Sequence, residues 1–271
     1  MKLRLLAAAA LVPVLFLVVF WAHKIVLAII LGLFCAIAAY ELLAVTGLVK
    51  NKRLVAYTAL VAFLHPLWSY FKMPLVVAQV GVLAFFVLLF AEILTSHGVI
   101  RFDSVAVCVT SGLLMPYLLS SLVRLMMMEH GRVYVFIPFV TAFLADSGAY
   151  FIGKKWGKHK FVPNISANKS SEGVIGGVAA SFVGMLVYCL ILQFCFQYQV
   201  NYWYAAIYGL ICAVAGVFGD LCFSVIKRQT GIKDYGNLIP GHGGILDRFD
   251  SMMVVAPLVE LLLVFLPVVE R

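Results

Sequence analysis

The composition of this 271-residue chain excludes water as its main solvent. Hydrophobic residues make up 64% of the sequence and charged residues only 12%, and the mean hydropathy is +1.07. Soluble domains carry about 25% charged residues and are about half apolar. Apolar segments close to the roughly 20 residues needed to cross a bilayer recur from end to end, so we predict an all-α, polytopic membrane helix bundle with about nine transmembrane helices.

The first predicted span has a basic start followed by an apolar run. Lys2 and Arg4 precede apolar residues up to Trp21, which is also how a cleaved signal peptide begins. A retained first helix is favoured, because no small-x-small cleavage site follows the run. Residues 22–24 instead lead directly into the next apolar segment.

Hydrophobic runs between charged or Pro/Gly breaks give the boundaries of the nine predicted spans. They lie near residues 5–21, 25–47, 54–71, 74–95, 104–126, 133–152, 173–196, 201–226 and 249–269. Residues 1–132 are interpreted as N-terminal transmembrane helices. Residues 133–271 are interpreted as C-terminal helices that carry the site, within one membrane unit. Gly173, Gly176 and Gly177 begin a span, where we expect them to permit close helix packing.

Positive charge is concentrated on one predicted face of the membrane. With a cytoplasmic N-terminus, 15 of the 20 Lys and Arg residues fall on the cytoplasmic side: Lys2, Arg4, Lys50, Lys52, Arg53, Arg101, Lys154, Lys155, Lys158, Lys160, Lys169, Lys227, Arg228, Lys233 and Arg248. The other side holds Lys24, Lys72, Arg124, Arg132 and Arg271. The positive-inside rule therefore favours a cytoplasmic N-terminus and, with nine spans, an external C-terminus.

Two long polar connections, near residues 153–172 and 227–248, both lie on the predicted cytoplasmic side. The net charge of +8 is therefore concentrated where it could meet anionic lipid head groups or a nucleotide. We expect the chemistry of the protein to be found in these connections and in the helix ends beside them.

Ionisable residues inside predicted spans mark candidate sites, because a charge in the bilayer is costly unless it faces protein or water. Asp146 and Asp220 each lie in the cytoplasmic third of a span, at a similar depth. Either acid alone could instead be a buried partner of a Lys or Arg from a neighbouring helix. Their shared depth favours a common site.

One helical face continues from Asp220 toward the cytoplasm. The residues at offsets of 4, 7 and 8 from this acid are Ser224, Lys227 and Arg228, and these offsets place side chains on one face of a helix. The sequence therefore predicts a polar stripe of one anionic, one hydroxyl and two cationic groups that emerges from the membrane.

The next connection and the start of the last predicted span add further polar groups. The connection carries Lys233, Asp234 and a Gly-His-Gly-Gly turn at 241–244, whose backbone can approach a phosphate closely. Asp247 and Asp250 then lie three residues apart at a helix N-terminus, where they could simply be favourable partners of the helix dipole. Together with Asp220 they could instead converge as oxygen ligands for Mg²⁺, and the mixture with cations favours phosphoryl chemistry.

Residues 219–250, GDLCFSVIKRQTGIKDYGNLIPGHGGILDRFD, closely resemble the signature of the phosphatidate cytidylyltransferase (CDP-diacylglycerol synthase) family. The matching residues are Ser224, Lys227, Arg228, Lys233, Asp234, Pro240, His242, Gly243, Gly244, Asp247, Arg248 and Asp250. Residues 146–177 are also similar to the family, from an Asp-Ser-Gly-Ala-Tyr start onward. Differences occur at Ser170 and Ser171, where Thr-Trp is common, and at Phe223, where many relatives have Glu.

The resemblance implies the reaction CTP + phosphatidate → CDP-diacylglycerol + pyrophosphate at the cytoplasmic face of a bacterial inner membrane. By this resemblance Asp220 and Asp247 would bind Mg²⁺, with Asp250 and Asp146 in support. The implied catalytic residues are Lys227, Arg228, Lys233, Asp234, His242 and Arg248, and the implied substrate-binding residues are Ser224, Gly243, Gly244 and Lys169. CTP, phosphatidic acid and the bilayer are the expected partners, and nucleic acid is not expected. A second cation and a homodimer are left open.

Two other function classes compete with this interpretation. Another CTP-using membrane transferase, such as a polyprenol or phytol kinase, would move the γ-phosphoryl group and yield CDP. A transporter or channel could use intramembrane carboxylates as ion sites. Against the second class, the chain shows no repeat symmetry, and its acids cluster on one side of the membrane, whereas a conduction path needs polar groups through the full depth.

Overall fold

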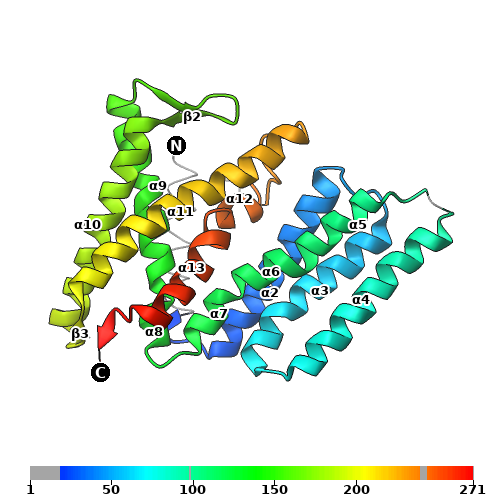
Figure 1. The fold of residues 1–271 in the computed structure, drawn as a ribbon, viewed down its shortest axis with the longest axis horizontal. Coiled ribbons are helices and arrows are strands. Elements are labelled where there is room, and N and C mark those ends of the chain that lie inside the picture. The colour runs from blue at the N-terminus through cyan, green and yellow to red at the C-terminus, as the bar shows by residue number, and fades with distance from the viewer. Residues whose placement is uncertain (1–18, 98, 239–242, 271) are drawn as a thin grey trace. The chain divides into compact units, whose positions relative to one another are not determined.

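The computed structural model describes residues 19–97, 99–238 and 243–270, so most of the predicted first span lies outside the described residues. The chain divides into two compact units. Unit 1 comprises residues 1–127 and 229–249, and unit 2 comprises residues 128–228 and 250–271. Helices make up nearly all of the described regular structure, which confirms the all-α prediction (Figure 1).

Seven helical segments among the described residues are long and apolar enough to cross a membrane. They are Lys24–Val45, Lys52–Phe71, Leu75–Thr95, Phe102–Met126, Gly131–Trp156, Ser171–Phe196 and Tyr202–Gln229. Each corresponds to one predicted span, with boundaries that agree to within a few residues. The predicted last span is instead divided into α12 (Leu246–Phe249) and α13 (Met252–Phe265), and α13 has only 14 residues. The expected count of nine was therefore only approximate.

Unit 1 contains the first four of these segments. They consist of α2 (Lys24–Tyr40) continued by the π-helix η1 (Glu41–Val45), α3 (Lys52–Phe71), α4 (Leu75–Thr95), and a fourth, interrupted segment. That segment comprises α5 (Phe102–Val109), η2 (Thr110–Leu114), α6 (Met115–Leu119) and α7 (Ser121–Met126). Asn51 begins α3 as an N-cap, because its side-chain oxygen accepts the backbone N–H groups of Arg53 at 2.8 Å and Leu54 at 3.4 Å.

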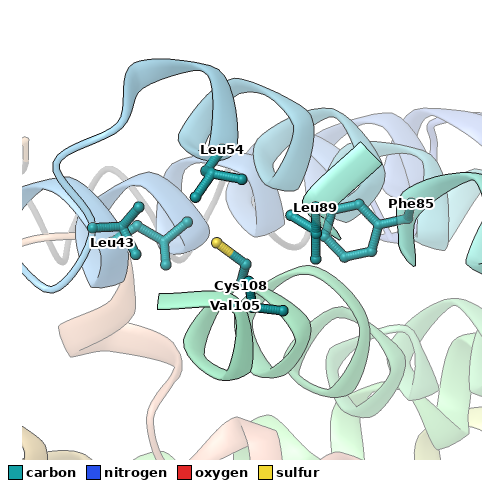
Figure 2. Close-up of a cluster of buried hydrophobic side chains, with 7 residues drawn as sticks. Leu43, Leu54, Phe85, Leu89, Val105 and Cys108 are labelled. Atoms are coloured by element: carbon teal, nitrogen blue, oxygen red, sulfur yellow. The ribbon is translucent and has the colours of Figure 1, made fainter. Parts of the chain in front are cut away.

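A cluster of buried apolar side chains holds the elements of unit 1 together (Figure 2). Leu43 comes from η1, Leu54 from α3, Phe85 and Leu89 from α4, and Cys108 from α5, and all are almost fully buried. Each such side chain contributes roughly 1.5–3 kcal/mol relative to exposure in water. In a bilayer the same contacts act mainly through close packing, because lipid tails are as apolar as leucine.

Unit 2 is built on the remaining long helices and two short antiparallel strand pairs. In chain order it contains α8 (Gly131–Tyr134), α9 (Phe136–Trp156), β1 (Lys160–Val162), β2 (Ser166–Ser170), α10 (Ser171–Phe196), β3 (Gln199–Val200), α11 (Tyr202–Gln229), α13 and β4 (Val269–Glu270). Lys160 pairs with Ser170 in the first hairpin, and Gln199 pairs with Glu270 in the second strand pair. The first hairpin occupies the predicted polar connection between α9 and α10.

Helices α9 and α10 lie side by side because glycines allow their backbones to approach (Figure 1). A Cβ atom on Gly177 would lie 2.6 Å from the carbonyl oxygen of Ala145, and one on Gly176 would lie 2.5 Å from Ile152. Both distances are shorter than a van der Waals contact. The predicted packing role of these glycines is therefore confirmed.

Candidate active site

Helix α11 carries the predicted polar stripe at its C-terminal end. Ser224 and Lys227 are buried, Asp220 is half-buried, and Arg228 is exposed. A buried lysine needs a nearby anion to offset the cost of removing its charge from water. The buried part of the stripe therefore marks a polar interior position in an otherwise apolar helix.

Gly219 brings this stripe beside the chain that precedes α13. A Cβ atom at this position would lie 2.8 Å from the carbonyl oxygen of Asp250 and 3.1 Å from the Cα atom of Ser251. Only a glycine permits the two backbones to come so close. The glycine thus places Asp220, the next residue of α11, near Asp250.

Asp250 is a deeply buried acid of unit 2, with an exposed fraction of 6%. It lies between α12 and α13, outside the seven candidate spans, and its Oδ1 accepts the backbone N–H of Ser251 at 2.7 Å. Burial, and then the nearby Asp220 carboxylate, raise the pKa of Asp250 to about 8, while the Ser251 bond and Lys227 act in the opposite direction. A cation beside these acids would stabilise their charged forms.

Two contacts hold the first hairpin against α11. Lys169 of β2 forms an ion pair with Asp220 of α11, and the Nε of Arg228 donates to the carbonyl oxygen of Ile165 at 3.1 Å. The sequence analysis gives these three residues different roles: Lys169 in substrate binding, Asp220 as a metal ligand and Arg228 in catalysis. The structure brings the first two into direct contact and shows that Arg228 binds the hairpin turn.

Glu172 and Ser170 fix the base of the same hairpin. The Glu172 carboxylate accepts the backbone N–H groups of Lys158 and His159, and its Oε1 lies 2.6 Å from the His159 Nδ1. The Ser170 hydroxyl accepts the Gly173 N–H at 3.1 Å and so caps α10. Ser170, one of the positions that differ from the family pattern, therefore has a structural role.

Asp247, a signature acid of unit 1, lies at the start of α12 and is buried. Its Oδ2 accepts the backbone N–H of Tyr235 at 2.7 Å and that of Gly244 at 3.0 Å. Gly243 has a left-handed φ of 82°, and a Cβ atom there would lie 2.7 Å from the same carboxylate oxygen. Gly243 and Gly244 are thus required by the fold of the segment around Asp247.

A second buried acid of unit 1, Glu41, was missed by the sequence analysis. Its two carboxylate oxygens accept the backbone N–H groups of Ile245 and Leu246, next to Asp247 in the chain. Glu41 lies near the end of an apolar run, and the rule that an acid within a span marks a candidate site could have identified it. Its partner residues could not have been identified in that way.

The remaining predicted residues fall into two groups. Lys233, Asp234 and Arg248 are exposed in unit 1, and Asp146 is exposed on α9 in unit 2. His242 lies outside the described residues. Lys233 and Arg248 are exposed to solvent, where a phosphate could reach them, and their catalytic roles stay predictions.

The acids supply the ligand chemistry that a hard cation such as Mg²⁺ prefers. Among residues 19–97, 99–238 and 243–270, no group of three or more His, Cys, Asp or Glu side chains has the geometry to hold a metal ion. Asp146, Asp220 and Asp250 belong to unit 2, and Asp247 belongs to unit 1. A common metal bound by Asp220 and Asp247 therefore stays a prediction.

The amino-acid sequence of this chain is similar to known proteins. Residues 2–266 match the family described as "Cytidylyltransferase family". A phosphatidate cytidylyltransferase of Staphylococcus haemolyticus is 43% identical over 134 residues, which cover 49% of this chain and 50% of that protein. The protein of the same name from Bacillus subtilis is 44% identical over 135 residues, covering 50% and 49%. The chain thus spans about half the length of the curated relatives it matches.

Proposed function

The chain belongs to the cytidylyltransferase family, and from that premise we propose that it is a phosphatidate cytidylyltransferase. It would join the CMP unit of CTP to phosphatidic acid and release pyrophosphate. The observation that carries the proposal is the group of acids and amines on unit 2, in which Lys169 pairs with Asp220, and Asp250 interacts electrostatically with Asp220 and Lys227. Such a mixture suits a reaction between two polyanions.

The chemistry needs positioning more than proton transfer. A phosphate monoester has a second pKa of about 6, so most of the lipid phosphate is already ionised at neutral pH. Its oxygen would attack the α-phosphorus of CTP, form the new P–O bond and displace pyrophosphate in line. No general base is required, and the protein's task is to hold two negatively charged reactants together.

Cationic side chains would carry much of that task. Lys227 is buried near Asp250, so its ammonium group has a fixed environment in which it can balance phosphate charge. Arg228, Lys233 and Arg248 are exposed and can reach phosphate oxygens as charged donors. Lys169 would exchange its bond with Asp220 for one with substrate.

The acids would hold a divalent cation. On the grounds of the sequence analysis and the family resemblance, we propose Asp220 and Asp247 as ligands for Mg²⁺, with Asp250 and Asp146 in support. The bound ion would supply positive charge to the phosphates during transfer. Within unit 2, the nearby carboxylates of Asp220 and Asp250 support a cation, because it would offset the repulsion between them.

The proposed site faces the cytoplasm of a bacterial cell, where CTP is available. Seven helices among the described residues are suited to a membrane, and the excess of Lys and Arg on one predicted side supports this orientation. The diacyl tails of the lipid can then remain in the bilayer while only the head group enters the site.

The test uses purified protein in detergent with Mg²⁺, phosphatidate and CTP labelled separately at the α- or the γ-phosphorus. We expect the α label to appear in the lipid and the γ label in pyrophosphate, and we expect neither product when diacylglycerol replaces phosphatidate. Transfer of the γ label to lipid, with CDP as the second product, would instead identify a CTP-dependent kinase. Absence of any transfer from CTP to phosphatidate would contradict the phosphatidate cytidylyltransferase assignment.

A further inference from the structure

Glu41 is a buried acid within a candidate membrane span, and the chemistry described above does not use it. It is the first residue of η1, lies in the span Lys24–Val45, and is only 3% exposed. An acid in such a position costs free energy unless protein groups compensate for the lost water. Its contacts therefore indicate what the side chain is for.

Both carboxylate oxygens of Glu41 bind the same short stretch of backbone. Oε1 accepts the N–H of Ile245 at 2.9 Å, and Oε2 accepts the N–H of Leu246 at 2.8 Å. Helix α12 begins at Leu246, and the N–H groups at the start of a helix have no partner within it. Glu41 supplies the missing acceptors from more than 200 residues away in the chain.

Two glycines leave room for this carboxylate. A Cβ atom on Gly244 would lie 2.4 Å from Oε1 of Glu41, and one on Gly236 would lie 2.9 Å from the same oxygen. Both values are too short for a carbon–oxygen contact, so any side chain at Gly244 would expel the carboxylate. The glycines of this segment and Glu41 are thus complementary in shape.

The backbone segment that binds Glu41 also binds the side chain of Asp247. Three consecutive backbone N–H groups donate to these two acids. The N–H of Gly244 donates to the Asp247 carboxylate. The N–H groups of Ile245 and Leu246 donate to the Glu41 carboxylate. The two acids act on each other electrostatically. Like charges are kept near each other here by backbone donors, so loss of one acid changes the environment of the other.

We propose that Glu41 is a positioning residue, which holds residues 244–247 so that the Asp247 carboxylate keeps the orientation required for phosphoryl chemistry. Glu41 does not itself touch substrate or metal in this assignment. The inference rests on the proposed function for its catalytic consequence, whereas its structural consequence can be measured without any activity.

The first experiment compares Glu41→Gln with a matched control. Glutamine has the same size but only one acceptor oxygen, so its NH₂ group would face a backbone N–H and one of the two bonds would be lost. We expect kcat to fall roughly 10–100-fold, as is typical when a group that orients a ligand is removed. The Mg²⁺ concentration for half-maximal activity should rise.

Glu92→Gln is the matched control, because Glu92 is also a largely buried acid within a span of unit 1. Its partners are Asn51, Tyr57 and Arg53, all remote in sequence from the Asp247 segment. This variant should keep the wild-type dependence on Mg²⁺. A Glu41→Gln enzyme with a wild-type kcat and Mg²⁺ response would overturn the inference while leaving the proposed function intact.

The second experiment measures residue-resolved hydrogen exchange without substrates. In the wild-type protein the amides of Ile245 and Leu246 should be strongly protected, and Glu41→Gln should speed the exchange of at least one of them about tenfold or more. Rapid exchange of both amides in the wild-type protein would contradict the inference, even if the variant failed to fold. Protection that survives in a folded Glu41→Gln protein would contradict it as well, whether or not the protein transfers CMP.

Discussion

The Asp247 carboxylate has a structural role in the fold beside the catalytic role proposed for it. One of its oxygens, Oδ2, accepts both backbone bonds, from Tyr235 and from Gly244. An asparagine amide oxygen at the same place could accept the same two N–H groups, but it would carry no charge. The structural and catalytic interpretations of Asp247 can therefore be separated by substitution.

Asp247→Asn should retain the fold and lose activity. If the carboxylate binds the metal, we expect lipid-dependent pyrophosphate release to fall roughly 100-fold or more, because charge stabilisation at phosphorus is lost. Asp247→Ala should in addition lower the free energy of unfolding by about 1–3 kcal/mol, since it leaves buried N–H groups without their acceptor. Thermal unfolding in detergent and a pyrophosphate assay measure the two effects. Near-normal turnover of Asp247→Asn would rule out the metal role for this residue.

The contacts of the individual site residues were harder to predict than the residues themselves. The ion pair between Lys169 and Asp220 joins a strand to a helix about 50 positions later, and Glu41 binds a segment still further away. Helical periodicity places side chains on a face but does not reach across such separations. The sequence could thus single out Asp220 as an acid within a span and Asp247 as part of the family signature, while the contacts of Glu41 and of the glycines around it required the folded chain.

At the level of elements, long apolar runs predicted the positions of the seven described spans to within a few residues. A helix in lipid must satisfy its backbone hydrogen bonds within itself, so each span needs one continuous apolar run. The predicted span at 249–269 was less accurate. Its polar start carries Asp250, whose carboxylate accepts the next backbone N–H, that of Ser251. Such a local bond competes with helical hydrogen bonding and accompanies the break between α12 and α13.

The close packing of α9 and α10 gives a prediction that involves no catalytic residue. Gly177→Ala would place a methyl group 2.6 Å from the Ala145 carbonyl oxygen, so the helices would have to move apart. We expect the free energy of unfolding to fall by about 1–3 kcal/mol. Gly81→Ala on α4 is the control, because no atom lies within 4 Å of that Cβ position.

Gly81→Ala should be neutral or stabilising by up to about 1 kcal/mol, since alanine favours a helix more than glycine does. Thermal unfolding in one detergent, with both variants and the wild-type protein, provides the comparison. Equal stability of the two variants would show that the α9–α10 contact tolerates a side chain, and the packing argument would fail.

At the scale of the whole molecule, apolar side chains are exposed on the helices suited to lipid, and charged side chains lie mainly in the connections. Helix α4 exposes Leu75, Val80 and Leu83 among other large apolar side chains, as expected for a segment that lipid can solvate. Charged groups instead collect in the connections, and 15 of the 20 Lys and Arg residues fall on one predicted side. This bias is the basis for the proposed orientation.

The orientation can be tested with single cysteines introduced into a protein from which the six native thiols have been removed. Lys158 lies in the connection between α9 and β1, and Met73 lies between α3 and α4; both are exposed. The charge bias places the first in the cytoplasm and the second outside, because the two connections fall on opposite sides in the predicted order of spans. Lys158→Cys should therefore resist a membrane-impermeant thiol reagent in intact cells and react in inside-out vesicles.

Met73→Cys should show the opposite pattern, and this reciprocity guards against a reagent that leaks through the membrane. The Lys158 substitution should spare the local fold, since the contact made there with Glu172 comes from the backbone N–H of residue 158. Labelling of Lys158→Cys from outside, together with protection of Met73→Cys, would invert the topology. The hairpin that pairs Lys169 with Asp220 would then face away from the cytoplasmic supply of CTP, and the proposed reaction would lose its substrate.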